Sequence, residues 1–90
     1  MKVSLLVSGH VQGVGFRYMT KIKADNLGVL GSVRNKANGD VYIEATGNEA
    51  VIREFIDIVK NSPAPFGRVD HVTINYLDEL EDYRSFSICY

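Results

Sequence analysis

Cysteine, proline and histidine are scarce in this sequence, and tryptophan is absent. The 90 residues include one cysteine, two prolines and two histidines. A single cysteine cannot form an internal disulfide, so we expect the chain in a reducing cytoplasm. Cys89 has only Arg84 as a basic neighbour, which favours a structural role over a nucleophilic one. Together with His10 and His71 it matches no metal-ligand spacing, so the sequence predicts no metal and no cofactor.

Long apolar stretches are also missing. The longest apolar runs are a few residues, which excludes a membrane-spanning helix. The first ten residues, MKVSLLVSGH, have neither the longer apolar region nor the cleavage site of a signal peptide. With 46% hydrophobic and 23% charged residues, the composition is that of an ordinary globular protein. We expect residues 1–90 to form one domain with a small core and no membrane contact.

Neither sign of charge dominates the chain, because ten basic side chains face eleven acidic ones. A net charge of −1 argues against a general nucleic-acid binder. The charges are unevenly distributed, however. Residues 1–36 carry six basic side chains and one acidic one, whereas residues 37–90 carry four basic and ten acidic ones. Lys21 and Lys23 are expected to form the solvated face of a helix, and Arg17 is the basic residue most suited to a site.

Two periodicities in the sequence, alternation and helical spacing, predict the order of elements. The expected elements are a strand over 2–8, a helix over 16–27, strands over 29–35 and 40–46, a helix capped by Asn48 and reaching Lys60, a strand over 69–77 and a short last strand over 85–90. The order β-α-β-β-α-β plus a final strand is typical of the ferredoxin-like split βαβ sandwich. This α+β fold has one mainly antiparallel sheet with two helices on one face, and it hosts many functions.

The stretch SGHVQGVGFRYMT places three glycines within seven positions, directly before the first expected helix. It is not a P-loop, because Gly15 is followed by Phe16 and Arg17. It is not a dinucleotide fingerprint, because Tyr18 replaces the third glycine. Such a loop still exposes backbone N–H groups at a helix start, and Arg17 adds a permanent charge and a planar fork for phosphate oxygens. The loop is therefore a candidate anion site; a tight turn with a surface arginine is the alternative.

The expected topology brings a second polar residue to this loop. The first strand, the first helix and the strand over 29–35 form a parallel crossover, so both strands end on the same side of the sheet. Val33 and Asn35 share a face, and Arg34 points the other way. If Val33 faces the helices, Asn35 faces the N-terminal end of the first helix. There its amide can position a water molecule, because it both donates and accepts hydrogen bonds.

At this point the chain resembles the acylphosphatase family. The residues VSGHVQGVGFR (Val7 to Arg17) are similar to its phosphate-loop signature, and GSVRNKANGDVYIEATG (Gly31 to Gly47) is similar to its second signature. The matching positions of the second signature are Asn35, Gly39, Val41 and Gly47. The resemblance covers essentially all 90 residues. Ser32 departs from it, since the family commonly has an aromatic residue there, and we expect softer local packing at this position. Asn38 stands where aspartate is more frequent.

The resemblance implies that Arg17 and Asn35 are the catalytic pair, with Asn35 orienting the attacking water. It implies a phosphate site made of Val11, Gln12, Gly13, Val14, Gly15, Phe16 and Arg17. The substrates would be acyl phosphates, cleaved to a carboxylate and inorganic phosphate without a metal, and the substrate's own phosphate could take the proton of the water. Inorganic phosphate and sulfate would compete for the site. We also expect a monomer.

Several alternatives remain open from the sequence. His10 could be a catalytic base or a variable loop residue, His71 a ligand or a plain strand residue, and Gln12 is expected to shape the loop. A different class of protein is a ferredoxin-like module that binds an anion or RNA without catalysis, although only Tyr42 suggests an RNA-binding sheet face. Another is the acylphosphatase-like domain of larger carbamoyl-transfer maturation proteins. The start at Met1 and the end soon after the last strand favour a free-standing enzyme.

Overall fold

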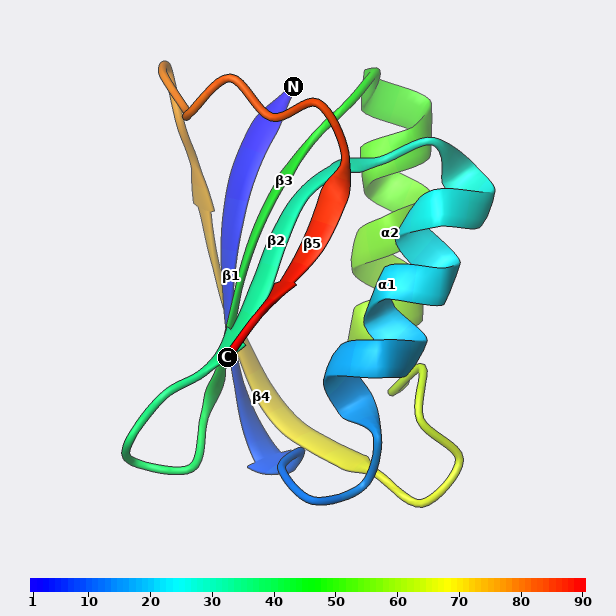
Figure 1. Cartoon of the computed structure of the whole chain (residues 1–90), viewed down its shortest axis with the longest axis vertical. Coiled ribbons are helices and arrows are strands. Elements are labelled where there is room, and N and C mark those ends of the chain that lie inside the picture. Colours follow the sequence, from blue (N-terminus) through cyan, green and yellow to red (C-terminus); the bar gives the residue numbers. More distant parts are fainter.

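One five-stranded sheet with two helices on one of its faces makes up the molecule (Figure 1). The computed structural model describes all residues from 1 to 90. The elements are β1 (Lys2–His10), α1 (Phe16–Leu27), β2 (Leu30–Asn35), β3 (Val41–Thr46), α2 (Glu49–Lys60), β4 (Arg68–Tyr76) and β5 (Phe86–Cys89). This confirms the ferredoxin-like order expected from the sequence. Neither helix has the length and apolar character needed to cross a membrane.

The strands lie in the order β4-β1-β3-β2-β5. The pairs β1–β3, β1–β4 and β2–β3 are antiparallel, while β5 pairs in parallel with β2. The sheet is therefore mixed and mainly antiparallel, as expected from the sequence, and β5 is the strand that pairs in parallel. Because β1 and β2 both run antiparallel to β3, they share one direction with β5. The carboxyl ends of these three strands consequently meet at the same end of the sheet.

The core lies between the sheet and the helices, and period-two alternation determines which strand residues enter it. The fully buried strand residues on this face include Val3, Leu5, Val7, Val33, Val41, Ile43, Ala45 and Phe86. From α2, Phe55 packs its ring against Phe86 in an edge-to-face geometry with centroids 5.9 Å apart. The predicted cap of α2 is confirmed, since the Asn48 side chain accepts a hydrogen bond from the backbone N–H of Val51.

The opposite face of the sheet is polar and carries a hydrogen-bond network centred on Glu44. The hydroxyl of Tyr83, which belongs to the segment between β4 and β5, donates to Oε1 of Glu44, and the hydroxyl of Tyr42 donates to Oε2 at 2.9 Å. Ser32 Oγ lies 3.0 Å from the Tyr83 hydroxyl. The small side chain at position 32 thus leaves room for Tyr83, so the expected softening of packing is replaced by a hydrogen bond.

The end of β1 carries a bulge that positions the following loop. The register between β1 and β4 shifts between Ser8 and Gly9. Gly9 has a φ of 137°, and a Cβ atom built there would lie 2.2 Å from the carbonyl oxygen of Arg68. Only glycine fits this close approach of two backbones. Bulges bend a strand, and this one lies at the end of β1, directly before the loop that leads to α1.

Candidate active site

The loop between β1 and α1 leaves the first turn of the helix without a protein cap. Gly15 occupies the N-cap position of α1 and offers no side-chain oxygen to the amides of that turn. Both Gly13 and Gly15 have a φ of 76°, and no atom lies within 4 Å of a Cβ built at either position. The glycines are therefore needed for their left-handed backbone, and the space beside them is open. Uncapped N–H groups beside open space can bind an anion.

The two ends of this loop are held in the core. Val11 and Phe16 are each only 1% exposed. Between them, the side chain of Gln12 reaches across to the β2–β3 hairpin, where its Nε2 donates to the carbonyl oxygens of Lys36 and Asp40, both at 2.8 Å. The expectation that Gln12 shapes the loop agrees with these contacts. The contacts link the loop directly to the turn that follows Asn35.

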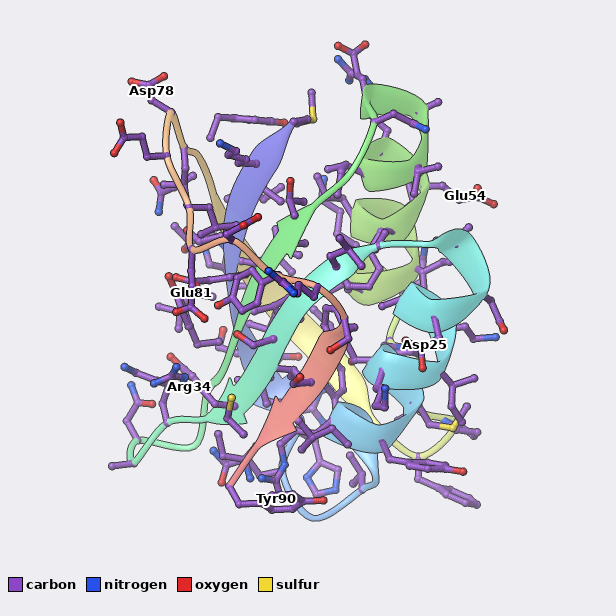
Figure 2. The ribbon with its side chains drawn as sticks, turned by 45° about the horizontal axis from the view of Figure 1, so that its top comes forward. Asp25, Arg34, Glu54, Asp78, Glu81 and Tyr90 are labelled. Carbon is purple, nitrogen blue, oxygen red and sulfur yellow. The ribbon has the colours of Figure 1, made fainter.

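Arg17 lies in the first turn of α1, and the last residues of the chain hold its guanidinium. Its Nη1 donates to the carbonyl oxygen of Cys89 at 3.2 Å. The ring of Tyr90 lies over the guanidinium, with 4.9 Å between Cζ and the ring centroid. Figure 2 shows Tyr90 beyond the end of β5, at the same end of the molecule as the loop before α1. Sequence reasoning missed the roles of Cys89 and Tyr90, because no local pattern predicts which strand the last strand pairs with.

Arg17 and Asn35 border the same cleft, which has a volume of about 190 Å³. Its lining residues are Val11, Gln12, Gly13, Gly15, Phe16, Arg17, Tyr18, Asn35, Ile88 and Tyr90. Six of the seven expected phosphate-site residues are among them. The seventh, Val14, instead packs partly buried against the core. The juxtaposition follows from topology, since Asn35 ends β2 and the loop follows β1, two strands that run in the same direction.

The histidines and the other basic residues have different surroundings. Neither His10 nor His71 lines the cleft. Lys21 is not simply solvated, as had been expected, because its Nζ donates to the carbonyl oxygen of Phe86 at 2.8 Å and pairs with Asp25 at 3.0 Å. Arg17 is thus the cation that lines the cleft. The fold contains no group of three or more histidine, cysteine or acidic side chains that could hold a metal ion; metal independence of the activity stays a prediction.

Comparison with known proteins identifies the class to which this fold and cleft belong. The crystal structure of acylphosphatase from Bacillus subtilis superposes with a TM-score of 0.94 at 38% identity, covering 99% of this chain and 98% of that one. The Acylphosphatase family model matches residues 3–88. An acylphosphatase from Enterococcus faecalis is 49% identical over 87 residues, which cover 97% of this chain and 96% of that protein. The chain belongs to the acylphosphatase family.

A likeness to a much larger protein is also present. The crystal structure of full-length HypF in its phosphate- and nucleotide-bound form matches with a TM-score of 0.86 at 28% identity. That match covers 99% of this chain but only 12% of the HypF chain. The similarity to HypF is therefore restricted to one small part of that protein.

Proposed function

We propose that this protein hydrolyses acyl phosphates, the mixed anhydrides of a carboxylic and a phosphoric acid, to a carboxylate and inorganic phosphate. The observation that carries the proposal is one cleft bordered by Arg17, Asn35 and the uncapped amides before α1. Membership of the acylphosphatase family supports it. The alternative of a binding module without catalysis is not favoured, since the proteins from Enterococcus faecalis and Bacillus subtilis that match over nearly the whole length of both chains are named acylphosphatases.

In the proposed reaction the phosphoryl group binds to the loop amides of residues 11–17 and to the Arg17 guanidinium. The side chain of Asn35 orients a water molecule opposite the carboxylate oxygen. The water oxygen forms a bond to phosphorus while the bond from phosphorus to the carboxylate oxygen breaks, and the carboxylate leaves with that electron pair. The proton of the water passes to an oxygen of the transferred phosphate. Atoms and charge are therefore conserved in a carboxylate and inorganic phosphate.

This assignment needs few catalytic groups, and the cleft offers few. A carboxylate is a good leaving group, so no strong general acid is required, and phosphoryl transfer depends mainly on positioning and on charge stabilisation. The cleft supplies one guanidinium, the amide side chains of Gln12 and Asn35, and backbone N–H groups. Because His10 and His71 do not border it, the phosphate oxygen is the proton acceptor that fits the geometry.

The test is phosphate release from benzoyl phosphate by the purified protein, with and without a chelator. We expect turnover that survives exhaustive chelation. A large loss restored by a divalent cation would overturn the metal-free mechanism. Binding of phosphate without any turnover would favour the binding-module alternative.

Finer properties belong to the same proposal. Residues 1–90 act as one acylphosphatase domain, as a monomer. The cytoplasm is the expected location. A chain with one cysteine has no internal disulfide, and internal disulfides are typical of proteins in oxidising compartments. Inorganic phosphate and sulfate compete with the substrate, since both are tetrahedral anions that suit the loop amides and Arg17.

A further inference from the structure

The cleft has a buried apolar floor and an exposed aromatic rim. Its lining includes Val11 and Phe16, which are buried and form its floor, and Tyr18 and Tyr90, which are 62% and 100% exposed. Side chains that line a cleft and are themselves largely exposed lie at its rim. The groups that suit a phosphate are the amides of the loop and the guanidinium of the half-buried Arg17.

Two of the exposed aromatic side chains of the molecule lie at this rim. Five large hydrophobic residues are exposed: Met1, Tyr18, Phe66, Tyr76 and Tyr90. Two of these five border the one cleft that also contains Arg17 and Asn35. Isolated exposed apolar residues are ordinary, but aromatic surface gathered at a concave site that also holds convergent polar groups is typical of ligand contact.

We propose that Tyr18 and Tyr90 form a subsite for the acyl group, and that the enzyme favours aromatic acyl phosphates over acetyl phosphate. This inference rests on the proposed hydrolysis. With the phosphoryl group on the loop amides and Arg17, the acyl group extends away from them toward the rim. A benzoyl group offers the tyrosine rings an aromatic partner for stacked or edge-to-face contact, whereas an acetyl group offers one methyl group.

The two tyrosines differ in whether they contact Arg17, and this difference allows an experiment to separate acyl selectivity from phosphate binding. Tyr90 stacks on the Arg17 guanidinium, so its removal affects both phosphate binding and acyl selectivity. Tyr18 is on α1, directly after Arg17, and no hydrogen bond or cation–π contact joins its ring to the guanidinium. Its removal therefore affects acyl selectivity alone.

The decisive measurement is the ratio of kcat/KM for benzoyl phosphate to kcat/KM for acetyl phosphate. We expect Tyr18→Ala to lower this ratio about 3–10-fold, as expected for the loss of an aromatic contact. The inhibition constant of inorganic phosphate should stay at its wild-type value, and Tyr18→Phe should retain the wild-type ratio. Tyr90→Ala should lower the ratio as well and raise the inhibition constant of phosphate about 2–5-fold, since it loses an exposed cation–π contact.

A matched control is Tyr76→Ala on β4, because Tyr76 is 65% exposed and lies outside the cleft; its ratio should equal that of the wild type. The subsite is wrong if Tyr18→Ala and Tyr90→Ala both keep the wild-type ratio, or if Tyr18→Ala slows both substrates equally. In either case the hydrolysis itself still stands. If the wild-type protein releases phosphate from neither compound, the proposed hydrolysis fails and the subsite fails with it.

Discussion

At the scale of single residues, Arg17 and Asn35 differ in what they would touch during the proposed reaction. Arg17 contacts the phosphoryl group in the bound substrate and in the transition state. Asn35 contacts mainly the attacking water. Interactions present only in the transition state accelerate the chemical step, whereas those present throughout also strengthen binding. Substitutions at the two positions should therefore have separable kinetic effects.

We expect Arg17→Ala to weaken both binding and turnover. Loss of the guanidinium removes a charge-assisted contact to the phosphate, so kcat should fall roughly 10²–10³-fold and the inhibition constant of phosphate should rise. Arg17→Lys should recover only part, because lysine keeps the charge but not the planar fork. Steady-state kinetics with benzoyl phosphate and inhibition by phosphate measure both effects. An alanine variant with wild-type phosphate inhibition would contradict the role of Arg17 in binding.

For Asn35→Ala we expect a loss of turnover with phosphate binding nearly unchanged. One preorganised hydrogen-bonding group is lost, so kcat should fall roughly 10²–10³-fold. Asn35→Asp keeps the shape but places a negative charge near the phosphate dianion, so its phosphate inhibition should weaken too. Thermal unfolding followed by circular dichroism serves as the control, since Asn35 is exposed. Near-normal turnover of the alanine variant, or activity lost only through unfolding, would show the assignment to be wrong.

At the scale of secondary-structure elements, two side chains form hydrogen bonds that join segments far apart in the sequence. Gln12 joins the loop before α1 to the β2–β3 hairpin. On the polar face, Tyr83 joins the segment between β4 and β5 to Glu44 on β3. The first link concerns the geometry of the cleft and the second the stability of the fold.

Removal of the Gln12 link should weaken anion binding. Gln12→Leu keeps the approximate size but loses both hydrogen bonds, each contributing about 0.5–1.5 kcal/mol to stability. With the loop less fixed, we expect the inhibition constant of phosphate to rise about 3–10-fold. Asn61→Leu is the control, because its Nδ2 also donates to a backbone carbonyl, that of Asp57 at 2.8 Å, away from the cleft. A similar rise in both variants would assign the effect to stability and not to loop position.

The Tyr83 link should make stability depend on alkaline pH. Burial, followed by the hydrogen bond to Glu44, raises the pKa of Tyr83 from 10.0 to about 12. A pKa raised in the folded state means that this stabilisation is complete below about pH 10 and is lost as the pH rises toward 12. Tyr83→Phe should lower the free energy of unfolding by about 1–2 kcal/mol at neutral pH, and by less at about pH 11.

Urea denaturation of the wild type and of Tyr83→Phe at both pH values measures this effect. Tyr76→Phe, at an exposed tyrosine on β4, should match the wild type at each pH. A difference between wild type and Tyr83→Phe that stays constant with pH would contradict the linkage.

At the scale of the whole molecule, charge is unevenly distributed along the chain. Residues 1–36 carry six basic side chains and one acidic one, and Arg17 of this part lines the cleft, whereas the acidic segment between β4 and β5 carries Asp78 at the end of the molecule opposite Tyr90 (Figure 2). The net charge of −1 hides this separation. A positive region around a cleft raises the local concentration of anionic substrates.

We therefore expect kcat/KM to fall as ionic strength rises. Lys36→Gln, in the exposed turn after β2, should lower kcat/KM about 2–5-fold at low salt and leave kcat unchanged, because only the approach of the anion is affected. The difference should vanish in high salt, where charges are screened over a few ångströms. Lys2→Gln, at the opposite end of β1, is the matched control. An equal effect of both substitutions would indicate net charge and not local steering.

The sequence by itself determined the order of elements and most of the cleft. Alternation and helical spacing report which side of a segment is buried, and that is enough to recover β1, α1, β2, β3, α2 and β4 with small shifts at their ends. The glycine turn before α1 could be predicted because a positive φ depends on the residue type at that position and not on distant contacts. The proximity of Asn35 to Arg17 could be predicted from the sequence. A parallel crossover between β1 and β2 has one handedness, so both strands end on the same side of the sheet.

Only the tertiary structure decided what lies beside Arg17. Whether β5 pairs with β2 or with β4, and in which direction, depends on a long-range backbone pairing that no local period reports. That pairing brings the carbonyl of Cys89 and the ring of Tyr90 to the guanidinium. The same holds for Gln12, whose side chain could be identified as structural but whose partners at Lys36 and Asp40 lie in a different part of the chain. Local patterns determine faces and turns, whereas the neighbours of a side chain follow from how the elements pack.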